Sequence, residues 1–307
     1  MRRLILHAGT PKTGTTSLQR CLQRNRNQLR EHGILYPDAA EAPPSKPKHQ
    51  WVVGALMGSD GSELARRIGL IEAEAEAEDR VEIHTIVLST EGIYHHWWDF
   101  SAAGRDALAA LAAAYSMEVW TWFRDPLSFA RSNYVQMLKN PRGYVPCYGL
   151  DLSIDEMFDD PWFARQLDYA GFIRDVESLL GVGTVKPFAY HRNTVDAFVD
   201  TVGVAIRDRE HTDAHRTPGA FGVEMLRLLN RHALSDADKA SAVSLITQLD
   251  DIMGARSGRF EVAPAMQDKI RRLADESLVM LQRDYGISLS PVITAGAVGA
   301  AASGAGR

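Results

Sequence analysis

The sequence is poor in several features that would point to particular classes of protein. It has only two cysteines, Cys21 and Cys147, too few for a disulfide scaffold or a four-cysteine zinc site and typical of a reducing compartment. Its net charge of −5 gives no basic field that would draw it to nucleic acid or to an anionic membrane. No run of about 18 apolar residues occurs, so we expect no transmembrane helix and no stable membrane insertion.

The N-terminus also lacks the apolar segment of a secretory signal. Arg2 and Arg3 precede only three apolar residues, Leu4 to Leu6, before His7 interrupts the run. This is far shorter than the apolar region of a signal peptide. Together with the low cysteine content, it predicts a cytoplasmic protein.

The composition is that of an ordinary globular enzyme. The chain has 307 residues, of which 45% are hydrophobic and 24% charged, enough to bury a sizeable core in one large domain or two small ones. No clear linker divides it, so we predict one domain over residues 1–290. Residues 291–307 are rich in Ala and Gly and have little to pack with, so we expect a disordered tail.

Short apolar runs alternate with helical patterns over the first two thirds of the chain. The predicted strands are residues 4–6, 34–36, 85–89, 119–123 and 185–189. The first predicted helix begins near Thr15 or Thr16 and carries Leu18, Leu22 and Leu29 on one face. Further helices are predicted at 102–115, 127–139 and 163–180. Helices dominate the predicted structure of residues 218–285. Residues 38–50 and 140–160 are predicted loops, and 72–79 a solvated helix end. Strands separated by helices indicate an α/β protein with a central parallel sheet flanked by helices and a helical C-terminal part.

A glycine-bounded turn, residues 9–16 (GTPKTGTT), joins the first predicted strand to the first helix. Such a turn presents backbone N–H groups and a helix N-terminus to an anion. The glycine spacing is that of a P-loop, but Thr15 stands where a nucleoside triphosphatase has lysine, and the lysine comes earlier, at Lys12. The alternative is a Gly/Thr-rich turn before an ordinary helix; the coincidence of loop, lysine and hydroxyls favours an anion site.

A second motif begins where the strand 119–123 ends. Arg124 follows the strand directly, and Ser132 lies eight residues later on the predicted helix. The planar guanidinium of arginine can donate two hydrogen bonds to one phosphate. A serine two turns into the helix can turn its hydroxyl toward the same edge of the predicted sheet. Taken alone, Arg-Asp-Pro is a common helix start and Ser132 an ordinary surface residue.

Together the two motifs resemble those of sulfotransferases that use 3'-phosphoadenosine-5'-phosphosulfate (PAPS), especially the bacterial and carbohydrate-type branches. Lysine within the turn, followed by Gly-Thr-Thr-Ser, is similar to the family's 5'-phosphosulfate loop, and the Arg-x7-Ser pattern to its 3'-phosphate motif. The resemblance, which follows the order of elements over roughly residues 4–240, implies a P-loop-like three-layer fold and PAPS as co-substrate. The residues it implies for PAPS are Lys12, Thr13, Gly14, Thr15, Thr16, Ser17, Arg124 and Ser132.

Two later positions match the family less closely. Tyr190, after the strand 185–189, resembles the tyrosine on the adenine side, although His191 and Arg192 replace the acidic pair often found there. A core aromatic is the equal alternative. Arg216 resembles the late basic loop near the 3'-phosphate, but the Arg-Lys-Gly form of that loop is absent.

Glu91 is the predicted base, because it follows the strand 85–89 at the edge where the acceptor should arrive. Carbohydrate-type relatives use glutamate as base, whereas cytosolic small-molecule relatives use histidine, so the rivals are His49, His95 and His96. A plain acidic residue at a helix start is the other interpretation of Glu91. Lys12 is expected to stabilise the leaving phosphate, and no metal is required if lysine and amides carry that charge.

The acceptor side is described only in outline by the sequence. Tyr94, Trp97, Trp98 and Phe100 could stack on a sugar or lipid-linked acceptor, although such clusters are more often core. Tyr144 and Tyr148 lie in the loop 140–160, a plausible acceptor-side flap. The predicted reaction is sulfuryl transfer to a hydroxyl or amine of a glycan, glycolipid or hydroxylated small molecule. The alternatives are an ATP-dependent phosphotransferase and a non-catalytic nucleotide-binding protein.

Overall fold

The computed structural model describes residues 1–38, 47–77, 81–142, 147–190, 193–206, 208–209 and 218–289. Several of the predictions above fall outside these residues: the tail 291–307, most of the loop 38–50, Tyr144, His191, Arg192 and Arg216. No helix among the described residues is both long and apolar enough to cross a membrane.

The centre of the described chain is a fully parallel sheet with the strand order β2–β3–β1–β4–β5. Its strands are β1 (Arg3–His7), β2 (Ile34–Leu35), β3 (Thr85–Ser89), β4 (Ser116–Phe123) and β5 (Val185–Ala189). From β1 the chain goes to the edge strand β2, returns to β3 and then crosses β1 to reach β4. The strand order therefore reverses around β1, and in parallel sheets such a reversal places ligands at the carboxyl ends of the strands.

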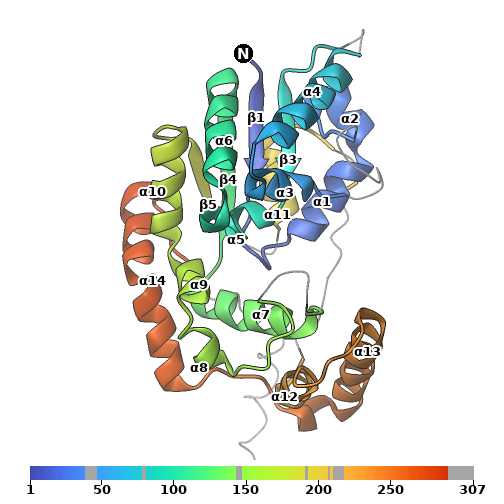
Figure 1. Cartoon of the computed structure of the whole chain (residues 1–307), viewed down its shortest axis with the longest axis vertical. Helices are drawn as coiled ribbons and strands as arrows, with labels where there is room; N and C mark the ends of the chain where they lie inside the picture. The colour runs from blue at the N-terminus through green and yellow to red at the C-terminus, as the bar shows by residue number, and fades with distance from the viewer. Residues whose placement is uncertain are drawn as a thin grey trace, which may run out of the picture.

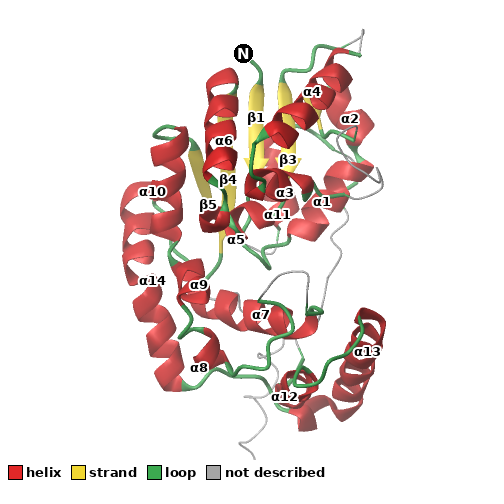
Figure 2. Cartoon of the chain, viewed as in Figure 1, coloured by secondary structure: helices red, strands yellow, loops and turns green. Residues whose placement is uncertain are grey.

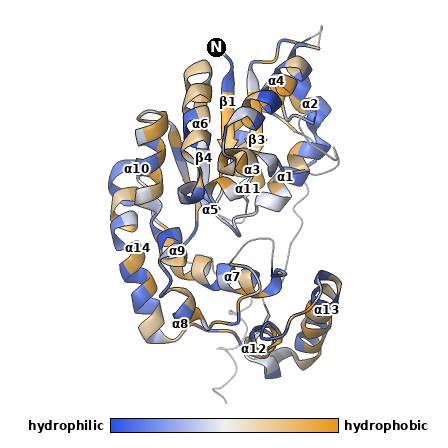
Figure 3. Cartoon of the chain, in the orientation of Figure 1, coloured by the Kyte–Doolittle hydropathy of each residue, from blue (hydrophilic) through white to orange (hydrophobic). Residues whose placement is uncertain are grey.

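Alternating side chains of the buried strands point to opposite faces, and helices cover both (Figures 1 and 2). Leu4 and Leu6 of β1 pack on one face, and Ile5 packs on the other. Figure 3 shows β1 largely in the colours of apolar residues. The first face is covered by α3 (Trp51–Met57), α4 (Ser62–Glu76), α6 (Ala102–Ala114) and α10 (Tyr169–Leu180). The second is covered by α1 (Thr15–Arg24), α2 (Arg26–Glu31) and α11 (Thr194–Val202).

A helical part with its own apolar cluster adjoins the carboxyl edge of the sheet. It contains α7 (Pro126–Lys139), α8 (Ile154–Met157), α9 (Pro161–Ala164), α12 (Ala220–Leu229), α13 (Asp236–Met253) and α14 (Pro264–Tyr285). Helix α14 packs against both α7 and α10, which joins the helical part to the sheet. Figure 1 shows α7 lying across the end of the sheet toward which β1 and β3 point.

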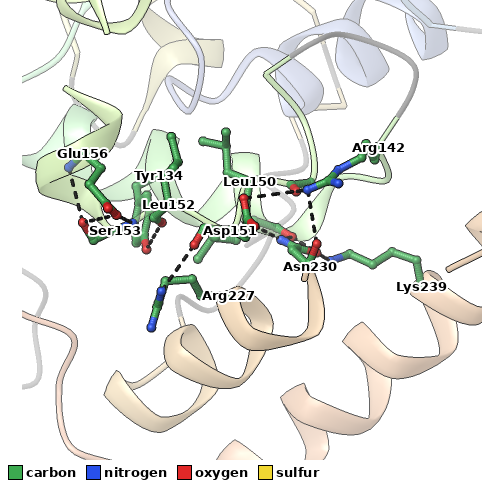
Figure 4. A network of polar contacts seen from close by, with 12 residues as sticks. Tyr134, Arg142, Leu150, Asp151, Leu152, Ser153, Glu156, Arg227, Asn230 and Lys239 are labelled. Atoms are coloured by element: carbon green, nitrogen blue, oxygen red, sulfur yellow. Dashed lines mark hydrogen bonds and ion pairs between the residues drawn. The ribbon is translucent and has the colours of Figure 1, made fainter. Parts of the chain in front are cut away.

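Polar side chains hold the C-terminal end of α7 in place (Figure 4). Asn230 Nδ2 donates to the carbonyls of Leu138 at 3.0 Å and Leu150 at 2.6 Å. The buried Lys239 Nζ donates to the same Leu138 carbonyl at 2.9 Å and to Asn230 Oδ1. Burial lowers the pKa of Lys239 to about 8. A carbonyl at a helix end has no partner within the helix, so these bonds fix α7 against α12 and α13.

The structure confirms the predicted fold: a three-layer α/β protein with a central parallel sheet and a helical C-terminal part. The predicted strands 85–89 and 185–189 have the observed bounds, whereas β4 begins at Ser116 rather than at 119. The predicted helix end at 72–79 is helical as far as Glu76, but it is not simply solvated, because Ala75 is buried and Glu72 and Glu74 form ion pairs with Arg2 and Arg30.

Three predicted segments were wrong, because side-chain caps end or start helices inside them. The first helix is divided at Asn25, whose Nδ2 donates to the carbonyl of Cys21 at 2.8 Å, so Leu29 belongs to α2. The predicted helix 163–180 is interrupted by Asp168, whose carboxylate accepts from Gly171 N at 2.7 Å and begins α10. The predicted loop 140–160 contains α8, which a Ser153–Glu156 capping box begins.

Candidate active site

The loop between β1 and α1 has an unusual backbone at two positions. Lys12 has φ 69°, and it is the one non-glycine residue with positive φ in the described part of the chain. Gly14, at the N-cap of α1, has φ 79°. A left-handed conformation costs a lysine on the order of 1–3 kcal/mol and persists only where the surroundings impose it. Such strain is typical of functional loops.

Side chains from outside the loop impose this conformation by holding its carbonyls. Arg124 Nη1 donates to the carbonyl of Lys12 at 3.0 Å, and Thr194 Oγ1 donates to the carbonyl of Thr13 at 2.8 Å. In a planar trans peptide, the N–H of the next residue points away from the carbonyl. The N–H groups of Thr13 and Gly14 are therefore turned away from Arg124 and Thr194.

The donors of this loop have no acceptor within the described ranges. No described residue accepts a hydrogen bond from the N–H groups of residues 13–16 or from the Lys12 ammonium. Thr15 Oγ1 is buried and likewise has no hydrogen-bond partner, whereas Thr16 is exposed and Ser17 partly exposed in the first turn of α1. A cation, a buried hydroxyl and a helix N-terminus within one loop are features that favour the binding of an anion.

The predicted pair of Arg124 and Tyr190 is brought together at the end of β4. The Arg124 guanidinium lies over the Tyr190 ring, 5.3 Å from its centroid. Backbone hydrogen bonds fix both residues, from Tyr190 N to the Phe123 carbonyl at 2.7 Å and from the Tyr169 hydroxyl to the Arg124 carbonyl at 2.9 Å. Arg124 Nε is buried without a partner. The guanidinium is thus held in place with a donor available to a ligand.

Ser132 lies on a face of α7 that is partly exposed. Asp125 caps this helix by accepting from Ser128 N at 2.8 Å, and Pro126 starts it. Helical spacing places Ser128, Arg131, Ser132, Val135 and Lys139 on one face. Ser132 is partly exposed, with no hydrogen bond to a described residue. Its hydroxyl is accessible to a ligand.

Two further arginines were not singled out from the sequence: Arg131 lies near Arg124, and Arg259 lies near Arg131. The ring of Phe260 stacks on Tyr134 of α7, with centroids 5.7 Å apart and planes at 29°, which brings Arg259 beside the turn that carries Arg131. Burial lowers the pKa of Arg131, and the charge of Arg259 lowers it further. Neither has an ion pair with a described residue. Helical spacing from Ser132 would have found Arg131, but only the tertiary stack reveals Arg259.

Glu91 lies beside the loop because the segments after β1 and β3 are hydrogen-bonded, from Thr90 N to the His7 carbonyl at 3.0 Å. Burial raises the pKa of Glu91, and the ammonium groups of Lys48 and Lys12 partly offset this rise. The carboxylate has no hydrogen bond or ion pair with a described residue. Burial raises the pKa of Tyr148 to about 12, and the charges of Cys147 and Glu91 contribute. Glu91 is therefore within electrostatic reach of both Lys12 and Tyr148.

The rival histidines are engaged or buried. His49 Nδ1 accepts from Ser89 N at 3.0 Å, and its Nε2 lies 3.0 Å from the Pro37 carbonyl. Burial lowers the pKa of His49 to about 4 and that of His95 to about 3. His96 Nδ1 lies 3.1 Å from Asp99 Oδ2. Of the four candidate bases, Glu91 alone combines partial exposure with a side chain that bonds to no described residue.

The aromatic residues after Glu91 belong mostly to the core. Tyr94, Trp97 and Phe100 are buried in the apolar cluster on the first face of the sheet, and the Tyr94 hydroxyl donates to the Gln166 carbonyl at 2.7 Å. Trp98 is only partly buried, and its Nε1 donates to Asp175 Oδ2 at 2.8 Å. Among the described residues, no group of three or more His, Cys, Asp and Glu side chains could hold a metal ion.

Gly9 is required where the loop leaves β1. His7 Nδ1 lies 2.7 Å from Ser89 Oγ, and the His7 ring packs against Trp122 and Phe198, with centroids 5.2 and 6.0 Å away. Burial lowers the pKa of His7 to about 3, so the ring is neutral. A Cβ at Gly9 would lie 2.8 Å from His7 Nε2, closer than real Cβ contacts. Because the ring is enclosed, the loop would have to move.

Gly9→Ala should therefore displace the loop donors from the anion. We expect pyrophosphate affinity, measured by calorimetry, to fall about tenfold or more, the effect of one lost charge-assisted contact. The overpacking should cost about 1–3 kcal/mol of unfolding free energy. Gly54→Ala in α3 is the control, because its Cβ would meet nothing within 4 Å. Unchanged pyrophosphate affinity in Gly9→Ala would contradict the assigned loop geometry.

Comparison with known proteins carries no argument about this chain. No family model matches the chain, and no curated protein matches it. Among solved structures, the chain is similar to a crystal structure of a sulfotransferase from Alicyclobacillus acidocaldarius. The two share 14% sequence identity over 92% of this chain and 95% of that one, with a TM-score of 0.45. A likeness at this level carries no argument about function, which must rest on the residues of the site.

Proposed function

We propose that this chain is a sulfotransferase that moves a sulfuryl group from PAPS to a hydroxyl or amine. The observation that carries the proposal is the pairing of two anion sites at one edge of the sheet, joined by the 3.0 Å hydrogen bond from Arg124 to the Lys12 carbonyl. One is the loop of residues 9–16, and the other contains Arg124. PAPS carries phosphate groups at the 3' and 5' positions of its ribose, so its binding requires two anion sites.

The chain's own residues match the parts of this donor. Lys12, the N–H groups of residues 13–16 and the Thr15 hydroxyl would bind the 5'-phosphosulfate, where unpartnered donors converge. Arg124 and Ser132 would bind the 3'-phosphate, with Arg131 and Arg259 adding positive charge. Tyr190, beneath the Arg124 guanidinium, would lie on the adenine side.

The transfer itself needs one base and one stabiliser of negative charge. The acceptor oxygen or nitrogen attacks sulfur, the bond from sulfur to the 5'-phosphate oxygen breaks, and adenosine 3',5'-bisphosphate leaves. Glu91 would take the acceptor proton, since a carboxylate whose pKa is raised by burial is a stronger base than an ordinary one. Lys12 would neutralise charge as it develops on the leaving phosphate.

The first test uses the donor's 3'-phosphate. The chain should bind PAPS more tightly than adenosine-5'-phosphosulfate, which lacks this group. One charge-assisted arginine contact is worth roughly 1.5–3 kcal/mol, so we expect a preference of about tenfold to a hundredfold. Arg124→Ala should remove most of the preference, because it weakens PAPS more than adenosine-5'-phosphosulfate; both donors should lose some affinity, since Arg124 also holds the Lys12 carbonyl. Calorimetry with both nucleotides and both proteins measures the four affinities.

Arg271→Ala is the control for this comparison, because Arg271 is exposed on α14 and pairs with Asp268. It should keep the affinities of the unmutated chain. Equal affinity of that chain for the two nucleotides would contradict the 3'-phosphate assignment. Tighter binding of ATP than of PAPS would instead favour the phosphotransferase alternative.

The second test addresses Glu91 through the dependence of rate on pH. A carboxyl whose pKa is raised stays protonated to higher pH than an ordinary one, near 4.3. A base must be deprotonated, so kcat/KM should fall as pH falls through this raised pKa. Glu91→Gln should lose about 10²–10⁴ in rate and should also lose this acid limb.

Turnover of labelled PAPS with a pool of glycans, glycolipids and hydroxylated small molecules supplies the rates. Binding of adenosine 3',5'-bisphosphate to Glu91→Gln should stay unchanged, which shows that the fold and the donor site are intact. If Glu91→Gln stays active and a separate His95→Ala variant is inactive, the base is histidine rather than Glu91.

A further inference from the structure

A second lysine at the transfer site has no role in the chemistry described so far. Lys139 is the last residue of α7 and is partly buried. Its ammonium has no hydrogen bond or ion pair with any described residue. A partly buried cation without a partner is unfavourable in itself, which suggests that a ligand supplies the missing charge.

The last turn of α7 lies at the end of the helix away from Arg124. Helical spacing places Lys139 two turns beyond Ser132 on the same face. Gly149 N donates to the Met137 carbonyl at 2.8 Å, which brings Tyr148, the residue influenced by Glu91, to this turn. Arg124, by contrast, precedes the opposite end of the helix. Lys139 therefore lies at the end of α7 away from Arg124, on the turn to which Gly149 is hydrogen-bonded.

Lys139 also lies close enough to Lys12 for their charges to interact. Burial lowers the pKa of Lys139, the charge of Lys12 lowers it further, and Asp250 opposes both effects. Two ammonium groups in mutual reach at a partly buried site repel one another. An anion bound between them relieves this repulsion.

The end of α7 leaves the Lys139 side chain available. A lysine in the last turn of a helix often bonds to the final carbonyls of that helix. Here Asn230 and Lys239 already donate to the Leu138 carbonyl, at 3.0 and 2.9 Å (Figure 4). The same bonds fix the turn that carries Lys139, so its ammonium is presented from a rigid support.

We propose that Lys139 is a further binding residue of the transfer site, and that its ammonium binds an anionic oxygen of a substrate beside Lys12. This inference rests on the proposed function, because it concerns the same site. The anionic oxygen has two possible sources: the sulfuryl group of the donor and an acid group on the acceptor.

The experiment compares Lys139→Met, which keeps the stem and removes the charge, with Lys139→Arg, which keeps the charge. Lys186→Met is the matched control, because Lys186 is exposed on β5. PAPS and adenosine 3',5'-bisphosphate, which lacks the sulfuryl group, are titrated into each protein. If the sulfuryl group is the source, Lys139→Met weakens PAPS roughly tenfold to a hundredfold and leaves the bisphosphate within about twofold. Lys139→Arg restores most of the PAPS affinity.

If an acid group on the acceptor is the source, both nucleotides bind to Lys139→Met as they do to the unmutated chain. The probes are then 4-nitrophenyl β-glucuronide and 4-nitrophenyl β-glucoside, which share an aglycone and differ in a carboxylate. With adenosine 3',5'-bisphosphate bound, the unmutated chain should prefer the glucuronide by about tenfold or more. Lys139→Met should lose this preference and Lys139→Arg should keep it.

Two results overturn the inference. One is a Lys139→Met protein that binds both nucleotides and both glycosides with the affinities of the unmutated chain. The other is unaltered PAPS binding by Lys139→Met together with an unmutated chain that does not prefer the glucuronide. Failure of the proposed function looks different, since it shows in the unmutated chain as equal affinity for PAPS and adenosine-5'-phosphosulfate. A rescue by Lys139→Arg separates loss of charge from damage to the fold.

Discussion

The hydrogen bond from Arg124 to the Lys12 carbonyl is the contact on which the candidate site depends. It connects the end of β4 to the loop after β1, and it holds the Lys12 carbonyl while Lys12 keeps a left-handed backbone. With that carbonyl held, the N–H of Thr13 points away from Arg124. The same guanidinium lies over Tyr190 and retains a buried donor of its own. A single arginine thus shapes one of the two proposed anion sites and forms part of the other.

The fold provides the rigidity that such a contact needs. The central strand β1 is hydrogen-bonded on both sides, and its last residue, His7, is enclosed by Trp122 and Phe198. The loop therefore starts from a fixed point and ends in α1, whose N-terminus favours negative charge. The helical part is rigid where it faces the carboxyl edge of the sheet, because Asn230 and Lys239 hold the end of α7 against α12 and α13 (Figure 4). Ser132 and Lys139, two turns apart on α7, are consequently held on one fixed helix.

The sequence predicts most of the fold because its signals are local. Apolar runs identify the strands, and the glycine spacing at residues 9–16 identifies the anion loop. Helix breaks at Asn25 and Asp168 escaped prediction, since single side chains that bond to the backbone decide them. Arg259 could not be found, because only the stacking of Phe260 on Tyr134 places it. The engagement of both His49 nitrogens likewise depends on residues distant in sequence, Pro37 and Ser89.

The central claim is that two anion sites, joined by Arg124, bind the two phosphate groups of one nucleotide. A crystal structure of the complex with adenosine 3',5'-bisphosphate measures this directly. The account predicts the 5'-phosphate on Lys12 and the N–H groups of residues 13–16, and the 3'-phosphate on Arg124 and Ser132, with the adenine beside Tyr190. A nucleotide bound elsewhere, or one whose 3'-phosphate points away from Arg124 into solvent, would contradict it.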